Sequence, residues 1–248
     1  MAAPGAPSVR EAPRRGERAA AAVRATPASP AAPSTAASAL AENGRPGVSG
    51  MGKARLEAFS DGVVAILITI LVLELKVPHG TDWAALRPLL PVFLTYLLSF
   101  VYLGIYWVNH HHLLHTLERV TGGVLWANLH LLLWLSLVPF TTGWMGENHG
   151  AAQPAALYGL VLLGAAVAYT VLQATIIAAH GPGSKLAAAV GRDLKGKASI
   201  VLYVAAIPLA FVRQELADAL FVTVALIWLV PDRRIERLFG TPATGAGA

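Results

Sequence analysis

The chain has 248 residues, of which 55% are hydrophobic and only 13% are charged. Because soluble domains carry about 25% charged residues, this composition indicates a membrane protein with several spans. The chain contains no cysteine, which excludes disulfides, thiolate metal sites and cysteine nucleophiles. Its formal net charge is +5, but the basic residues flank apolar runs, as topology signals do, and we therefore expect no nucleic-acid partner.

The first 50 residues differ in composition from the rest of the chain. They are rich in Ala, Pro, Ser and Gly, with Arg between them, and their prolines would interrupt any helix. They contain no central apolar run of the kind that a signal peptide needs. We therefore expect a disordered tail over 1–50, a membrane domain over 51–235 and a flexible tail over 236–248.

Apolar segments then follow one another through the middle of the chain. They cover residues 56–76, 84–108, 121–145, 155–179, 198–213 and 216–231. About 20 apolar residues cross a ~30 Å hydrocarbon core, and the second, third and fourth segments meet that length. The last two are short and could form one re-entrant hairpin or two tight spans. The predicted fold is an all-α membrane protein with six transmembrane helices, with four as the alternative.

Lysine and arginine residues predict the orientation of these spans. In a six-span arrangement 16 of the 19 lysines and arginines fall on one side, and only Lys76, Arg87 and Arg213 fall on the other. By the positive-inside rule both termini are cytoplasmic. The charge pattern thus favours an even number of spans independently of hydropathy.

Within the spans, two prolines and two glycines predict local features. Pro139 and Pro208 lie inside apolar segments and should kink their helices. Gly159 and Gly164 lie in an alanine-rich segment and should allow close helix packing.

The first apolar segment carries polar residues where a simple span would have none. Residues 55–75 read RLEAFSDGVVAILITILVLEL. Since a carboxylate near a helix centre in lipid costs ~2.5–3.5 kcal/mol, Asp61 indicates a helix that is surrounded by protein. One side of this helix is bulky and carries a single hydroxyl: Phe59, Ile66, Thr69, Ile70 and Leu73. The periodicity alone favours ordinary helix packing for that side.

The stretch RLEAFSDG resembles the R-x-x-x-F-S-D signature of the transmembrane protein 175 family, which comprises potassium channels of endosomes, lysosomes and bacteria. IYWVNHHHLLH in the second segment and NLHLLLWLSLVPF in the third are similar to further segments of this family. The resemblance covers residues 52 to about 235. It implies that the first helix of every subunit lines a central pore, and the six-span length resembles that of bacterial members, which assemble as homotetramers.

Carried over by position, the resemblance gives the apolar helix a gate. Ile66 would form the narrowest ring, Ile70 and Leu73 would form further rings, and Thr69 would lie one turn from the constriction. A ring of aliphatic side chains offers an ion no ligands and blocks conduction by dewetting. The resemblance thus implies a moderately potassium-selective channel with a hydrophobic gate, with K⁺ as the permeant ion and no cofactor. It implies an integral protein of the bacterial plasma membrane, whose partners are lipid and its own copies.

The resemblance also implies a network between helices that holds the pore helix in place. Its candidate members come from the first three segments: Arg55, Phe59, Ser60, Asp61, Trp107, His110, His111 and Asn128. Arg55 and Asp61 are six residues apart and do not meet on one helix, so each needs a partner elsewhere.

Two other function classes remain as alternatives from the residues. A proton- or cation-coupled transporter could use Asp61 and the histidines of 110–115, but it should show internal repeats, and we find none. An enzyme would need a nucleophile–base pair or a metal triad. His111 and His115 have a spacing that can bind zinc, yet hydrogen-bonded histidines are the favoured interpretation, and we expect no metal site and no catalytic residue.

Overall fold

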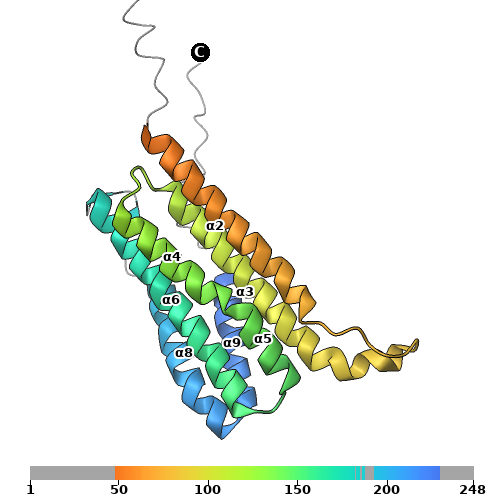
Figure 1. Ribbon diagram of the computed structural model, residues 1–248. Coiled ribbons are helices and arrows are strands. Elements are labelled where there is room, and N and C mark those ends of the chain that lie inside the picture. The colour runs from red at the N-terminus through yellow and green to blue at the C-terminus, as the bar shows by residue number, and fades with distance from the viewer. Residues whose placement is uncertain (1–47, 182, 185, 188–192, 230–248) are drawn as a thin grey trace, which may run out of the picture. The chain divides into compact units, whose positions relative to one another are not determined.

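The computed structural model describes residues 48–181, 183–184, 186–187 and 193–229 (Figure 1). Over these residues the protein is all-α, as predicted. Five stretches are long and apolar enough to cross a membrane: Gly52–Leu73, Trp83–His115, Gly122–Glu147, Ala152–His180 and Leu194–Val212. Most of the tail predicted at 1–50 and all of the tail predicted at 236–248 lie outside the described residues.

The second predicted span is longer than hydropathy indicated. The 3-10 helix η1 (Trp83–Leu89) leads into α3 (Leu90–His115), whereas the prediction ended at residue 108. Pro91 stands in the first turn of α3, where its fixed φ and missing N–H favour helix initiation. The histidines of 110–115 therefore belong to the helix and not to a connecting loop. Hydropathy missed the last seven residues of α3 because five of them are asparagine or histidine, while their backbone is still helical.

The third predicted span is broken into two helices, as expected from its proline. α4 (Gly122–Ser136) ends one residue before Leu137, and α5 (Val138–Glu147) begins with Pro139 in its first turn. Proline has no N–H to continue the hydrogen-bond ladder of the preceding helix, so the interruption falls there. Pro208, by contrast, lies inside α8 (Leu194–Val212) and does not end it.

The last two predicted spans form a tight helical hairpin. Only Arg213, in an extended conformation, separates α8 from α9 (Gln214–Leu229), and the two helices pack against each other. Gln214 and Glu215, which lie between the two predicted apolar segments, already belong to α9, because glutamine and glutamate favour a helix. At 1.5 Å per residue α8 is ~28 Å long and the described part of α9 is ~24 Å long.

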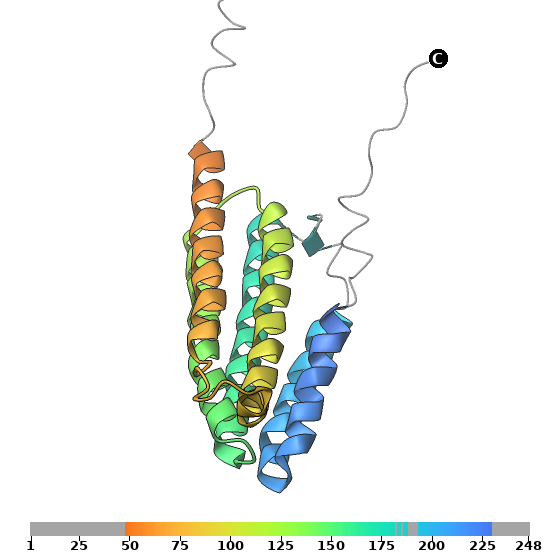
Figure 2. The same ribbon diagram turned by 90° about the vertical axis from the view of Figure 1, so that its right-hand side faces the viewer.

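Two hydrophobic clusters hold the helices together. The first joins residues of α2 (Val48–Leu73), α3, α4 and α6 (Ala152–His180), and the second joins α3, α5, α6, α8 and α9. Gly159 lies against Phe221 and Gly164 lies against Trp134, which confirms the predicted close packing of this segment. α2 packs on α3, α4 and α5, on the other side of the bundle from the α8–α9 hairpin (Figure 2). One side of α2 is therefore left uncovered by the described part of the chain.

Candidate functional site

α2 has one buried and one exposed side. The buried residues recur at helical spacing: Leu56, Ser60, Val64, Leu67 and Leu71. On the opposite side, Ile66 is 58% exposed and Leu73 is 78% exposed, and Ile70 and Thr69 are also exposed. The four residues predicted to line a pore thus share a face of α2 that the described part of the chain leaves exposed or only partly covered.

The hydroxyl of Thr69 is oriented by its own helix. It donates a hydrogen bond to the carbonyl oxygen of Ile66 at 2.8 Å. A hydroxyl has one proton and two acceptor lone pairs, so this bond uses the proton and leaves the oxygen as an acceptor on the exposed face. An oxygen acceptor is the kind of group that can ligate a cation.

A buried chain of hydrogen bonds ties α2 to two neighbouring helices. The Asn128 amide on α4 donates from Nδ2 to Ser60 Oγ on α2 at 3.0 Å, and its Oδ1 lies 2.7 Å from His110 Nε2 on α3. Ser60 in turn donates to the Leu56 carbonyl at 2.9 Å, so its oxygen is free to accept from Asn128. The arrangement requires that His110 carry its proton on Nε2. All three side chains are buried, and the chain of bonds fixes the position of α2.

A second polar contact joins α2 to α3 nearer the surface. The Trp107 indole donates from Nε1 to Asp61 Oδ1 at 3.0 Å, and the Trp107 ring lies 6.4 Å from the ring of His111. Asp61 therefore accepts a hydrogen bond from another helix of the same chain, as we expected for a carboxylate in an apolar segment. Arg55 and Phe59 are exposed, and within the described ranges the Arg55 side chain forms no hydrogen bond or ion pair. The structure thus brings together six of the eight predicted network residues.

The histidines of α3 are packed with one another and with α2. The rings of His111 and His115 stack at 5.5 Å between centroids, and Lys53 on α2 donates to the His115 carbonyl at 2.9 Å. Among the residues described, no group of three or more His, Cys, Asp or Glu side chains stands close enough to hold a metal ion. A further histidine, His130, accepts from the Trp134 indole at 3.0 Å, a pairing that its spacing of four residues could have predicted.

Sequence reasoning missed a groove beside α2. It has a volume of about 440 Å³ and lies between the last turns of α2 and helices α4 and α5, with Leu67, Ile70 and Glu74 on the α2 side. At the same end of the molecule Lys76 pairs with Glu147 at 2.6 Å. The groove directly adjoins the exposed face of α2, so that face and its flank are both open.

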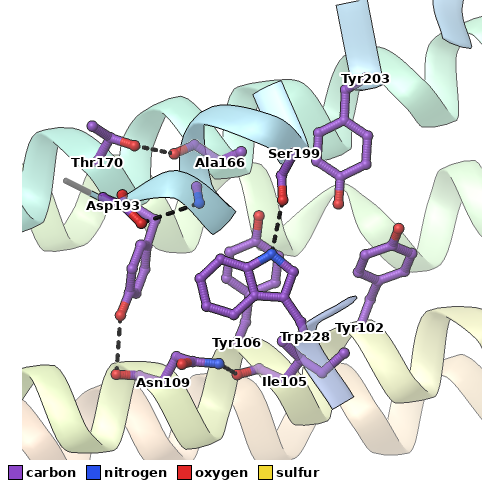
Figure 3. Close-up of a pocket in the computed structure, with 12 residues that line it drawn as sticks. Tyr102, Ile105, Tyr106, Asn109, Ala166, Thr170, Asp193, Ser199, Tyr203 and Trp228 are labelled. Atoms are coloured by element: carbon purple, nitrogen blue, oxygen red, sulfur yellow. Dashed lines mark hydrogen bonds between the residues drawn. The ribbon is translucent and has the colours of Figure 1, made fainter. Parts of the chain in front are cut away.

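Sequence reasoning also missed an internal cavity that α2 does not reach. Figure 3 shows it between α3, α6, α8 and α9, surrounded by tyrosines and Trp228. Its volume is about 40 Å³, room for roughly three water molecules. The polar walls bond to each other, for example Trp228 Nε1 to Ser199 Oγ at 2.8 Å and the Tyr169 hydroxyl to the Asn109 carbonyl at 3.1 Å. This small, internally bonded cavity is no ion pathway through the subunit.

The fold and these contacts define a multi-span α-helical membrane protein with one helix held by polar bonds on one side and open on the other. The family model for the endosomal/lysosomal potassium channel TMEM175 matches residues 55–139. A potassium channel of Chryseobacterium sp. (strain P1-3) is 54% identical over 187 residues, which are 75% of this chain and 97% of that protein. The chain therefore belongs to the TMEM175 family, a family of ion channels and not of enzymes.

Other relatives support the same assignment. A potassium channel of Streptomyces collinus is 39% identical over 126 residues, or 48% of this chain and 61% of that protein. The crystal structure of a lysosomal potassium-selective channel TMEM175 homolog from Chamaesiphon minutus superposes with a TM-score of 0.64 and 29% identity, over 74% of this chain and 98% of that one. The chicken endosomal/lysosomal proton channel TMEM175 is 39% identical over 83 residues, only 17% of its length.

Proposed function

We propose that the protein is a potassium channel in which α2 of each subunit lines the pore of a homotetramer. The observation that carries this proposal is the open face of α2, which bears Ile66, Thr69, Ile70 and Leu73 opposite a face anchored by Ser60. The relatives named potassium channels support conduction of K⁺ by a channel and not coupled transport. This function needs several copies, because the residues that the structure describes enclose no pore along α2 within one chain.

The chemistry of the open face suits a pore better than lipid. A lipid-facing stretch gains from uninterrupted large apolar side chains, whereas this face carries Gly62 and the hydroxyl of Thr69 in mid-helix. The groove of about 440 Å³ beside α2 leaves room for side chains from a helix of the neighbouring subunit. Four copies around a common axis would then place four α2 helices side by side and cover these open surfaces.

In such a pore Ile66 forms the narrowest ring. A β-branched side chain has few rotamers, so four Ile66 side chains make a stiff apolar constriction that excludes water when closed. One turn away, four Thr69 oxygens face the ion, because each hydroxyl proton is held by the Ile66 carbonyl of its own helix. K⁺ sheds its hydration water more readily than Na⁺, and we expect moderate selectivity for K⁺ from this combination.

The orientation follows from the charge distribution. Of the eight lysines and arginines in the described ranges, five lie at the end of the bundle where α2 begins: Lys53, Arg55, Arg119, Lys195 and Lys197. Together with the bias of the sequence across the six-span arrangement, this supports an orientation in which that end and both termini face the cytoplasm of a bacterial plasma membrane. Lys76 and Glu147, which pair at the other end of the bundle, then face the outside. Ions leaving the cell would pass Arg55 first and Leu73 last.

Ion flux in liposomes tests this proposal. The purified protein is reconstituted, and flux under opposed K⁺ and Na⁺ gradients is compared for wild type, Ile66→Asn and the control Val72→Asn. Val72 is an exposed apolar residue of α2 that points about 120° away from Ile66. We expect uncoupled flux that favours K⁺, and altered gating or selectivity only in Ile66→Asn. A flux that requires a proton gradient would overturn the channel proposal, and equal effects of both variants would overturn the assignment of Ile66.

A further inference from the structure

The short helix η1 is apolar, yet none of its residues is buried. Arg87 is the only charged residue among its seven, and the chain packs η1 only against the start of a span, on α3. Trp83 is 87% exposed and Leu86 is 44% exposed. The described part of the chain thus leaves an indole and a leucine side chain uncovered at the end of the bundle where α2 ends.

The side chains of η1 are sorted by the period of a 3-10 helix. Because such a helix has about 3.0 residues per turn, residues three apart lie on the same side. This period places Trp83, Leu86 and Leu89 on one side of η1. Ala84 and Arg87, both exposed, share another side. η1 therefore has one side of large apolar side chains and one side that carries a positive charge.

η1 does not continue the axis of α3. Leu89, where the two helices meet, has φ −86° and ψ −8°, whereas the ψ of a regular α-helix is about −42°. Figure 2 shows η1, in gold, nearly end-on at the lower end of α3, and the same view shows α3 lengthwise. η1 therefore runs across the direction of the spans, parallel to the plane of a bilayer.

The length of α3 places η1 at the edge of the hydrocarbon core. Residues 90–108 of α3 contain no charged residue and no histidine, and they rise ~28 Å, close to the ~30 Å of the core. The head-group region adds ~5–8 Å on each side. If η1 continued along the axis of α3, it would extend ~14 Å beyond the core and carry Trp83 into water. Because it runs across that axis, all of η1 can lie within the head-group region.

We propose that η1 is an anchor that lies in the head-group region of the bilayer, with Trp83 and Leu86 turned toward the acyl chains and Arg87 toward the phosphates and water. A tryptophan ring is favoured at this boundary because it joins a large apolar surface to one N–H donor. Anchors of this kind set the tilt and rotation of the helix that they adjoin, which here is α3. The inference concerns contact with lipid and holds whether or not the chain conducts K⁺.

Spin labels on single cysteines test the proposal, since the chain has no cysteine of its own. Leu86→Cys probes the apolar side of η1 and Ala84→Cys probes the other side. His79→Cys, in the loop before η1, is the reference for water, and Val204→Cys, an exposed position within α8, is the reference for the hydrocarbon core. The labelled full-length protein is reconstituted in liposomes. Electron paramagnetic resonance then compares access of oxygen, which concentrates in lipid, with access of a nickel chelate, which stays in water on both sides of the bilayer.

We expect the oxygen-to-nickel ratio at Leu86 to lie between the two references, and the ratio at Ala84 to match that of His79. Adding Trp83→Ala should shift the ratio at Leu86 toward that of His79, whereas Trp126→Ala, which removes another exposed tryptophan, should leave it unchanged.

Three results would overturn the proposal. A ratio at Leu86 equal to that of His79 would place η1 in water, and equal ratios at Leu86 and Ala84 would contradict the two sides of η1. Low access of both reagents to Leu86 would show that another copy of the chain covers this side instead of lipid. Equal shifts from Trp83→Ala and Trp126→Ala would overturn the assignment of Trp83 as the anchoring residue.

Discussion

Replacing Asn128 with alanine should loosen the helix that carries the open face. The change removes two hydrogen bonds, at 3.0 Å to Ser60 and at 2.7 Å to His110, and leaves the buried His110 N–H without an acceptor. Hydrogen bonds between membrane helices contribute ~0.6 kcal/mol on average and up to ~1.7 kcal/mol. A buried polar group without a hydrogen bond costs a further ~1–3 kcal/mol in soluble proteins. For a membrane protein the loss of stability is smaller than this, because the unfolded state also lies in the membrane. We therefore expect Asn128→Ala to lower the free energy of unfolding by about 2–3 kcal/mol.

Reversible unfolding in detergent measures this loss, and the chain offers a matched control. Among the described residues the Asn109 amide donates only to the Ile105 carbonyl of its own helix, at 2.7 Å, so Asn109→Ala should cost less than about 0.5 kcal/mol. A double-mutant cycle of Ser60→Ala with Asn128→Ala should show coupling, because the two side chains share a hydrogen bond. If Asn128→Ala is no more destabilising than Asn109→Ala, or if the cycle shows no coupling, the buried chain of bonds does not hold α2.

Two further substitutions test the packing and the polar contact at the surface. Gly164→Ala places a methyl group against the Trp134 ring, and it should lower the free energy of unfolding by ~1–3 kcal/mol and so lower the unfolding temperature. Gly62→Ala is the control. Its added methyl group meets no atom within 4 Å, so it should leave the stability unchanged or raise it. Equal unfolding temperatures for the two glycine variants would contradict the close packing. Trp107→Phe keeps an aromatic ring but removes the hydrogen-bond donor to Asp61. It should lower the free energy of unfolding by about 1 kcal/mol in the same assay. An unchanged stability would show that this hydrogen bond contributes nothing.

The sequence predicted those features that depend on local chemistry. The break between α4 and α5 falls at Pro139 because a proline cannot donate to the preceding turn. The helical repeat placed Ile66, Ile70 and Leu73 on one side of α2, but it did not predict that this side is exposed in the single chain. His110, the member of the histidine run that is 3% exposed, could also have been selected, since Leu113 and Leu114 lie on the same side of α3 and are buried.

Features that depend on contacts between distant segments could not be predicted in the same way. The bond from Asn128 to Ser60 joins residues 68 positions apart, and only the packing of α4 on α2 brings them together. An outer groove between α3 and α9 brings Asp218 together with His149 of another segment. A single sequence gives each of these residues an identity but no partner, because the partner depends on how the helices pack.

Cysteine accessibility along α2 tests the central claim most directly, because the protein has no cysteine of its own. Ile66→Cys, Ile70→Cys and Leu73→Cys lie on the open face, and Val64→Cys and Leu71→Cys lie on the buried face as controls. Each variant is reconstituted, and K⁺ flux is recorded before and after a positively charged thiol reagent is added. We expect the reagent to block flux in the three open-face variants and to leave the two controls unchanged. Block at the buried positions, or flux unaffected at all five, would contradict a pore lined by this face of α2.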